Sequence, residues 1–167
     1  SVWHEGTTFV VSVPLGSDHV PANQPPATPA RGSTAIGAIP YVEEALRYDA
    51  PLHLFTRYAL EDLDYAGLRL KKGEVVGLLL GAANRDPARW ERPADLDPDR
   101  PRLWGHLAFN VGPRHCAGAH MARMEATEAI LGMWRAFPDL ARAPGAPDPA
   151  LIGFVSRAWR PIPLVHE

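Results

Sequence analysis

The stretch FNVGPRHCAG, residues 109–118, holds the single cysteine of the 167-residue chain and decides how the rest of the sequence is interpreted. Directly after it, apolar residues recur at the spacing of one buried helical face and predict a helix over residues 119–137: Ala119, Ala122, Ala126, Ile130, Met133 and Phe137. Cys116 therefore stands just before a helix N-terminus. There the positive end of the helix dipole and free backbone N–H groups stabilise a thiolate and reduce its electron donation.

The residues around Cys116 suit a flat, anionic partner. Gly112 and Gly118 allow tight turns and a close approach to the backbone. Arg114 offers a planar fork for a carboxylate, and Phe109 offers an apolar plate near the sulfur. A large planar anionic cofactor bound through iron would use all of these features. The alternative for a lone cysteine is a buried or unreactive free thiol.

The five residues Phe109, Gly112, Arg114, Cys116 and Gly118 resemble the haem-binding signature of the haem-thiolate monooxygenases, the cytochrome P-450 family, in its bacterial form. The resemblance implies a haem b cofactor whose iron is ligated by Cys116. It also implies that the other four residues contact the haem.

A second resemblance lies upstream, where Glu44-Ala45-Leu46-Arg47 is similar to the ExxR helix of this family. Arg100 follows at about the expected distance from the cysteine loop. In the family these positions form a buried Glu–Arg–Arg network that holds the meander, the irregular segment before the cysteine loop, onto the haem core. In this sequence that segment begins at residue 91. By spacing alone, Glu44 and Arg47 would instead form a solvated i, i+3 pair.

Further site residues follow from the same resemblance. Arg57 corresponds to an arginine that pairs with a haem propionate, and His106 either contacts a propionate or caps its loop. The substrate-lining positions lie just before Arg57 and in the C-terminal hairpin: Leu52, His53, Leu54, Phe55 and Phe154.

The first 35 residues differ in composition from the remainder. Five prolines within residues 14–29 forbid a helix there, so residues 1–35 are predicted to be an irregular segment, followed by a partial haem-thiolate domain over 36–167. Glu5, Thr7 and Thr8 resemble a displaced acid–alcohol pair for proton delivery to iron-bound oxygen. This makes them catalytic candidates, although Gly6 and the prolines contradict a continuous helix.

The remaining pattern predicts a mainly α fold with a small antiparallel β component. A helix is expected over residues 40–49, because Pro40 suits a first turn and Pro51 forbids continuation. Turn signals favour strands at 52–60, 68–70 and 75–80, a short helix over 84–90, and terminal strands within 154–165. By resemblance, this is the C-terminal, haem-ligating part of the family's fold, truncated.

Composition excludes several other classes of function. The formal charge of −2, from 17 basic and 19 acidic residues, favours neither nucleic acid nor an anionic membrane. The longest apolar stretch, residues 75–83, is far shorter than the roughly 20 residues of a membrane span. One cysteine and the lack of a signal-peptide pattern fit the cytoplasm. Zinc-ligand spacing, a phosphate loop and a nucleophile elbow are all missing.

The function implied by resemblance is a monooxygenase that inserts one atom of dioxygen into a small organic substrate. The electrons would come from a ferredoxin-type partner, steered by the charges of Arg114, His115 and Arg123. Two alternatives stay open: a non-catalytic remnant or helper, and a haem-binding module without oxygenase activity. Apolar helix faces that lack the family's other helices predict self-association.

Overall fold

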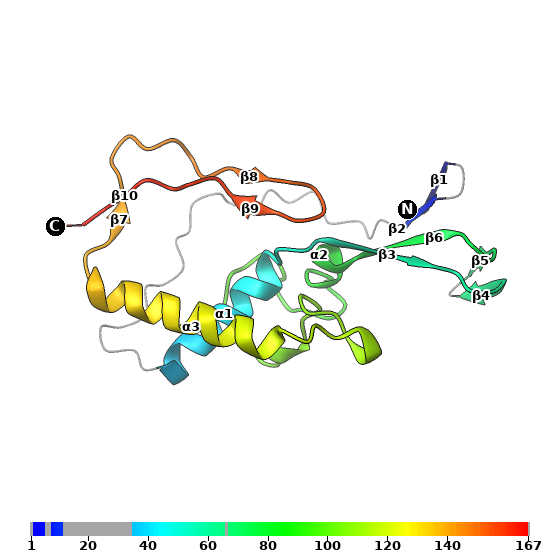
Figure 1. The fold of residues 1–167 in the computed structure, drawn as a ribbon, viewed down its shortest axis with the longest axis horizontal. Coiled ribbons are helices and arrows are strands. Elements are labelled where there is room, and N and C mark those ends of the chain that lie inside the picture. The colour runs from blue at the N-terminus through cyan, green and yellow to red at the C-terminus, as the bar shows by residue number, and fades with distance from the viewer. Residues whose placement is uncertain (1, 6–7, 12–34, 66, 167) are drawn as a thin grey trace.

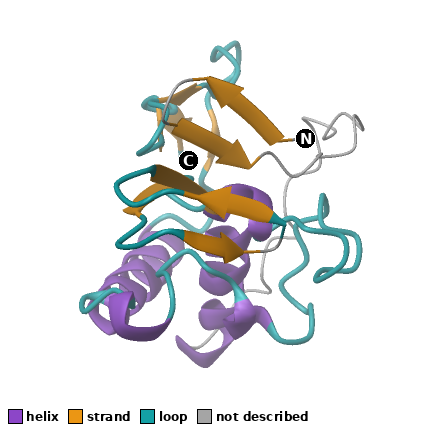
Figure 2. Cartoon of the chain, turned by 90° about the vertical axis from the view of Figure 1, so that its right-hand side faces the viewer, coloured by secondary structure: helices purple, strands orange, loops and turns teal. Residues whose placement is uncertain are grey.

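Two helices, α1 (Ala35–Tyr48) and α3 (Ala119–Ala136), cross at the centre of the computed structural model, which describes residues 2–5, 8–11, 35–65 and 67–166 (Figure 1). The strands lie together on one side of this helical layer (Figure 2). The four-stranded sheet lies beyond the C-terminal end of α1, and the C-terminal strands lie above α3 in the view of Figure 1. None of the described helices is long and apolar enough to cross a membrane.

Helix α1 begins five residues earlier than the sequence predicts, so Pro40 lies inside the helix. Proline removes one intrahelical hydrogen bond there, which local propensity disfavours. Packing outweighs that cost, since Ala38 and Val42 are buried against the rest of the structure. The C-terminal end agrees with the prediction, because residues just before Pro51 are driven out of the helical region.

Helix α3 agrees closely with its predicted span, but its apolar face is divided between two neighbours. Ala119 and Leu131 are buried, whereas Ala126 and Ile130 line a cleft. Tyr41 of α1 and Trp134 of α3 meet edge-on, with ring centroids 6.1 Å apart. The predicted burial of the last residues of this face is wrong: Met133 is 39% exposed and Phe137 is 40% exposed.

The four-stranded sheet has the order β1-β2-β6-β3, with bounds Val2–Glu5, Thr8–Val11, Val75–Leu79 and Leu54–Tyr58 respectively. Strands β3 and β6 are antiparallel, with Leu54 opposite Leu79, and β2 is parallel to β6. The expectation of an irregular segment over 1–35 is therefore wrong for 2–5 and 8–11, and 12–34 lie outside the described residues. A separate hairpin joins β4 (Leu63–Tyr65) and β5 (Leu68–Leu70).

The connection from the sheet to the cysteine loop is made of short elements. Helix α2 (Leu80–Ala83) follows β6 without a break, so the helical turn comes before residues 84–90, where it is predicted. Residues 84–90 form turns instead, and the Trp90 N–H donates to the Asp86 carbonyl at 2.9 Å. Two 3₁₀ turns follow the meander, η1 (Leu103–Gly105) and η2 (Gly112–Arg114).

The C-terminal segment forms two short antiparallel pairs, as the terminal pattern predicts in part. Strand β7 (Ala141–Arg142) pairs with β10 (Leu164–Val165), and β8 (Leu151–Ile152) pairs with β9 (Ala158–Trp159). The turn of the second pair is attached to the chain just before β3. There the His53 N–H donates to the Val155 carbonyl at 3.1 Å, and the Arg157 N–H donates to the Pro51 carbonyl at 2.7 Å.

Gly153→Ala is expected to open the β8–β9 hairpin. Gly153 has φ +88°, and a Cβ there would overlap the Ser156 carbonyl oxygen, so the backbone must move in addition to being strained. The cost exceeds the roughly 1–3 kcal/mol of an unfavourable backbone conformation alone. Amide hydrogen exchange at the Arg160 N–H, which donates to the Ala150 carbonyl, measures how far the hairpin opens.

Gly73→Ala is the matched control for that substitution. Gly73 has φ +87°, but no atom lies within 4 Å of the place that a Cβ would take, so only the backbone conformation is penalised. If Gly73→Ala lowered the free energy of unfolding as much as Gly153→Ala, the contact with Ser156 would have no role.

Candidate functional site

A cleft of about 610 Å³ opens between α1, α3, the chain preceding β3 and the cysteine loop. Its described lining is almost entirely apolar: Val42, Ala45, Leu46, Asp49, Pro51, Leu52, Phe55, Ala108, Phe109, Asn110, Arg114, Cys116, Ala122, Ala126 and Ile130. A pocket with apolar walls and a few polar groups is typical of a cofactor or small-molecule site.

Cys116 lies on the floor of this cleft, one turn before α3, and its side chain is exposed. This placement is not that of a buried thiol. The Cys116 N–H donates to the Phe109 carbonyl at 2.8 Å, and the Cys116 carbonyl accepts from the Ala119 N–H at 3.2 Å. The loop is thereby closed on itself and joined to the first turn of the helix.

Two loop residues adopt the left-handed conformation, Gly112 with φ +63° and Asn110 with φ +62°. Asparagine tolerates this region better than most residues, so the loop can turn at position 110 without glycine. Gly118 lies in the predicted tight turn, which the Ala119 N–H closes onto the Cys116 carbonyl, but its φ of −86° is open to any residue and does not require glycine. A Cβ at Gly118 would lie 3.9 Å from the Cys116 sulfur, an ordinary contact distance.

The two arginines predicted to face propionates lie in different settings. Arg114 lines the cleft beside Cys116. Arg57 lies on β3, two residues beyond the cleft-lining Phe55 and therefore on the same face of the strand. Its guanidinium carbon is 5.5 Å from the Phe55 ring centroid, and its Nη1 donates to the Thr56 carbonyl at 2.9 Å.

His106 is buried, and both of its ring nitrogens are engaged within the chain. Its Nε2 lies 2.9 Å from Glu43 Oε2, and its Nδ1 accepts from the Ala108 N–H at 3.1 Å. It is not among the described residues that line the cleft. The contacts therefore tie the ring to α1 and to the start of the cysteine loop.

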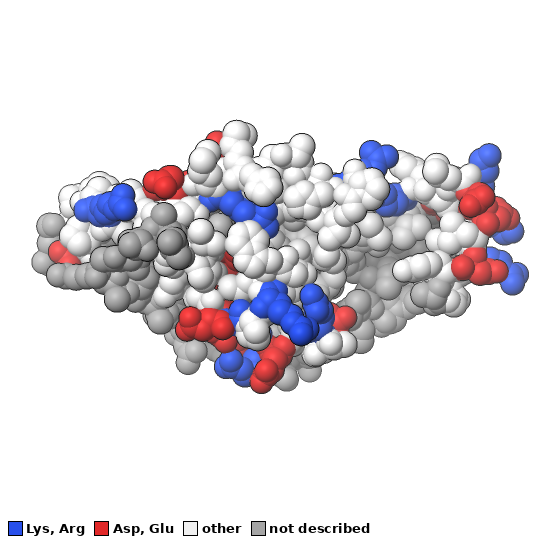
Figure 3. All heavy atoms as spheres, turned by 90° about the horizontal axis from the view of Figure 1, so that it is seen from below, with Lys and Arg blue, Asp and Glu red and all other residues white. Residues whose placement is uncertain are grey.

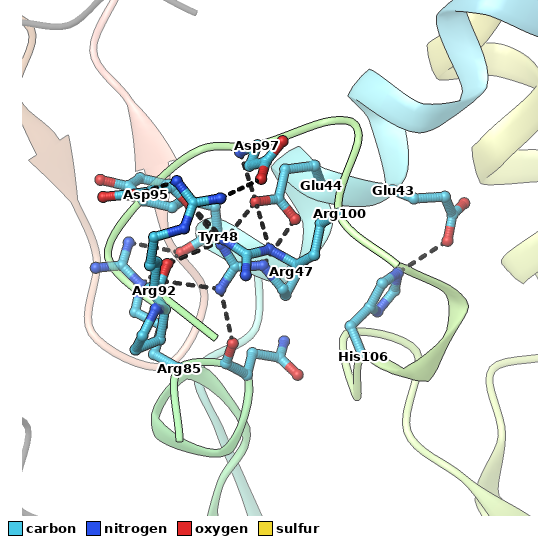
Figure 4. A network of polar contacts seen from close by, with 12 residues as sticks. Glu43, Glu44, Arg47, Tyr48, Arg85, Arg92, Asp95, Asp97, Arg100 and His106 are labelled. Carbon is cyan, nitrogen blue, oxygen red and sulfur yellow. Dashed lines mark hydrogen bonds and ion pairs between the residues drawn. The ribbon is translucent and has the colours of Figure 1, made fainter. Parts of the chain in front are cut away.

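The Glu44–Arg47–Arg100 network joins α1 to the meander (Figure 4). Arg47 holds both Glu44 oxygens at 2.7 Å through Nε and Nη2, and Arg100 Nε approaches Glu44 Oε1 at 3.3 Å. Glu44 and Arg47 have no exposed surface, so they are not the solvated pair that spacing alone indicates.

The same network fastens the meander backbone. The Asp97 N–H donates to Glu44 Oε1 at 2.8 Å. The Arg47 guanidinium donates to three carbonyls within 3.0 Å: those of Asn84, Pro93 and Asp95. Arg100 likewise donates to carbonyls of the meander: those of Glu91, Arg92 and Asp95. Residues 91–100 have no helix or strand of their own, so these buried charges hold them in place.

The predicted substrate-lining residues divide into two groups. Leu52 and Phe55 line the cleft, whereas His53, Leu54 and Phe154 are not among its described lining residues. Phe154 lies in the turn of the β8–β9 hairpin and is 82% exposed. His53 points away toward Gly81, where a Cβ would lie 2.6 Å from its Nδ1.

His53 belongs to a polar cluster with Asp49 and Arg157. Its Nε2 is 3.2 Å from Asp49 Oδ1, and Arg157 Nη1 lies 3.1 Å from the ring and 3.4 Å from the same carboxylate. Burial lowers the pKa of His53, the Arg157 charge lowers it further, and Asp49 only partly opposes this. The neutral ring is therefore the form that the folded chain favours.

Acidification is expected to weaken the fold through His53. Because the folded pKa lies below the unfolded value of about 6.5, the stabilisation is complete above that pH and is lost as pH falls through the lower folded pKa. Urea unfolding at pH 7.5 and at pH 5 checks this. His53→Gln, which does not titrate, is expected to lose less stability on acidification, and an identical loss in both proteins would contradict the role of His53.

The structure describes the backbone of two of the three proton-relay candidates. Glu5 and Thr8 lie on strands β1 and β2, where they are paired in register, and Thr7 lies outside the described residues. Thr8 is in line with Val75 and Tyr58, at the end of β3 opposite to Leu54. Glu5 and Thr8 therefore lie on paired strands rather than on a helix.

One part of the site was missed by the sequence interpretation. Glu43, next to the ExxR glutamate, is buried and contacts both His106 and Arg123. The sequence did contain a signal for this contact, the pair of adjacent glutamates. Neighbouring helix positions point about 100° apart, so Glu43 and Glu44 must face different partners.

Comparison with known proteins identifies the arrangement. A family model described as cytochrome P450 matches residues 38–140, a span that contains the ExxR helix, the meander and the cysteine loop. The chain belongs to the cytochrome P450 family. Members of this family carry haem iron ligated by cysteine, which confirms the predicted cofactor at the level of the family.

Individual P450 relatives are bacterial. The chain is 43% identical over 123 residues to "Putative cytochrome P450 140" of Mycobacterium tuberculosis, which covers 74% of this chain and 28% of that protein. It is 43% identical over 99 residues to the biotin biosynthesis cytochrome P450 of Bacillus subtilis, covering 59% and 25%. The chain thus spans less than a third of the length of these relatives.

Solved P450 structures show the same fold. P450BioI in complex with an acyl carrier protein ligated to hexadec-9Z-enoic acid superposes with a TM-score of 0.71 at 38% identity, covering 78% of this chain and 34% of that one. The hydroxylase HmtN of himastatin biosynthesis gives a TM-score of 0.72 at 31% identity, covering 79% and 36%.

Proposed function

We propose that this chain is the C-terminal, haem-ligating portion of a P450 monooxygenase, with Cys116 as the axial ligand of haem b. The observation that carries the proposal is the exposed Cys116 thiol on the floor of an apolar cleft, directly before α3. When bound, the haem supplies the activation of dioxygen and the transfer of one oxygen atom to an organic substrate. The short coverage of the relatives supports assigning only this portion to the chain.

The residues of the chain would each contribute a defined part. The N–H groups and dipole of α3 would stabilise the negative charge of the Cys116 thiolate. Phe109 and the aliphatic side chains of the cleft would exclude water from one face of the cofactor. Arg114 and Arg57 would neutralise its propionates, and His106 would position the loop from its contact with Glu43.

Arg114→Ala and Arg57→Ala are each expected to weaken haem retention, because a propionate then loses a charged donor. Arg→Lys at either position should restore only part of the affinity, since lysine cannot form a bidentate fork. Titration of the chain with haemin measures the dissociation constant. Equal affinity in all four variants would remove both arginines from the site.

The deciding experiment is the absorption spectrum of the purified chain with added haem, reduced and exposed to carbon monoxide. A thiolate-type Soret band is the expected result and supports haem ligation. Failure to take up haem would favour the alternative of a non-catalytic remnant or helper. A thiolate-type band without substrate oxidation in the presence of a surrogate ferredoxin system would favour a haem-binding module.

We also propose that the chain takes electrons from a ferredoxin-type partner and is located in the cytoplasm. On the face shown in Figure 3, acidic and basic side chains are intermingled, so no single field covers it. Arg114 and His115 are exposed beside Cys116, whereas the charge of Arg123 is paired with Glu43. Because Arg114 would also be paired, with a propionate, once haem is bound, steering of an acidic partner would rely mainly on His115, and a reduction rate that does not vary with ionic strength would argue against it.

Self-association is the last part of the proposal. Exposed Met133 and Phe137 on α3, with Trp159 and Val165 of the C-terminal hairpins, support it. Sizing of the isolated chain tests it, and a monomer at high concentration would contradict it.

A further inference from the structure

A second buried charge cluster lies on α1, one residue before the ExxR glutamate. Glu43 is 1% exposed and His106 is 6% exposed, and their side chains meet at 2.9 Å (Figure 4). From α3, Arg123 reaches the same carboxylate, with Nε 2.5 Å from Oε1 and Nη2 3.1 Å from Oε2. The Glu43 carboxylate therefore joins α1, α3 and the entrance of the cysteine loop.

The bidentate contact fixes where the Arg123 guanidinium lies. Its central carbon is 4.5 Å from the Phe109 ring centroid and 4.9 Å from the Trp104 ring centroid. His106 lies on the same aromatic group, with its ring centroid 6.1 Å from that of Phe109. A guanidinium at this distance is attracted by an aromatic face. Both partners of Glu43, Arg123 and His106, therefore lie against the Phe109 ring.

Phe109 in turn holds the cysteine, because its carbonyl accepts the Cys116 N–H at 2.8 Å. We propose that Glu43 is the positioning residue of the cysteine loop: by holding Arg123 and His106 against Phe109, it sets the place of the Cys116 backbone. This inference rests on the proposed function for its meaning, but not for its test, which needs no haem.

The charge state of Glu43 fits this role. Burial raises its pKa, but the hydrogen bonds from His106 and Arg123 outweigh burial and lower the pKa below its ordinary value. The carboxylate is therefore ionised at neutral pH and accepts from both donors at once. A neutral amide of the same shape would present an N–H to one of the two donors and lose that contact.

Glu44 provides a matched comparison within the same helix turn. It is equally buried and equally charged, but it faces Arg47, Arg100 and the meander. Glu43→Gln and Glu44→Gln thus remove the same charge one residue apart, and both destabilise the chain. They differ in which element each is expected to release.

The experiment is amide hydrogen exchange on the haem-free chain, read at the Cys116 N–H and at the Arg100 N–H, which donates to Asp97. Glu43→Gln should speed exchange at Cys116 by about tenfold relative to Arg100, the effect expected when a buried charged hydrogen bond is lost. Glu44→Gln should produce the opposite ratio. Arg123→Lys, which keeps the charge but loses the fork, should reproduce Glu43→Gln.

Equal acceleration of both amides in the two glutamine variants would overturn the proposal and leave Glu43 as a general stabilising residue. An unchanged Cys116 rate in Glu43→Gln would overturn it as well. Addition of haemin gives an independent readout, since Glu43→Gln should shift the haem reduction potential more than Glu44→Gln. If the chain takes up no haem, the proposed function fails while the exchange result still decides the role of Glu43.

Discussion

Cys116→Ser is expected to eliminate the thiolate-type Soret band of the reduced, carbon monoxide-bound chain. A neutral hydroxyl is a poor donor to iron, whereas a thiolate is a strong, soft ligand. Cys116 is the single cysteine of the sequence, so no other residue can supply a thiolate. The absorption spectrum of haem-loaded protein measures the loss, and an unchanged band would refute Cys116 as the ligand.

The fold itself should tolerate this substitution. Cys116 is exposed, and the hydrogen bonds that hold its loop position are made by its backbone. Replacing sulfur by oxygen there should change the free energy of unfolding by no more than about 0.5 kcal/mol. His115→Ala, at the adjacent exposed residue, is the matched control and should keep the band. Loss of the band in both variants would point to a disturbed loop.

The sequence predicts the elements that are determined by residues close together in the chain. The span of α3 follows from a regular apolar repeat, and the position of Cys116 before its first turn follows with it. The ExxR helix ends as predicted because Pro51 acts on its immediate neighbours. These are also the parts of the site for which the resemblance to P450 rests on residues at fixed short offsets.

Features that depend on distant partners are not predictable in this way. The start of α1 is set by packing around Ala38 and Val42, which overrides the local signal of Pro40. Glu43 finds Arg123 80 positions later in the sequence, and no periodicity reveals that contact. Strand β2 pairs with β6, about 65 positions away, and β1 pairs with β2, so neither strand follows from its own composition.

Arg47→Ala is expected to cause the largest loss of stability of any substitution in the chain. It leaves the fully buried Glu44 carboxylate without its bidentate partner, removes the Arg47 donor from the carbonyls of Asn84 and Pro93, and leaves the Asp95 carbonyl with Arg100 as its donor. Breaking a buried pair by removing one partner costs about 3–5 kcal/mol. Since small domains are stable by only about 5–15 kcal/mol, urea unfolding should show a chain close to its unfolding threshold.

Two further variants separate the causes of that loss. Arg69→Ala removes an arginine from an exposed pair with Asp64 and should leave the unfolding midpoint almost unchanged, because solvent screens that contact. Glu44→Leu combined with Arg47→Met removes both charges and should be less destabilising than Arg47→Ala, since no buried carboxylate is left with only the longer 3.3 Å contact to Arg100. If the double variant were the less stable of the two, the additional cost would lie in the lost contacts of Glu44 with Arg100 and the Asp97 N–H, because both variants lose the Arg47 contacts. If Arg47→Ala unfolded at the same midpoint as Arg69→Ala, the buried network would not be what fastens the meander to α1.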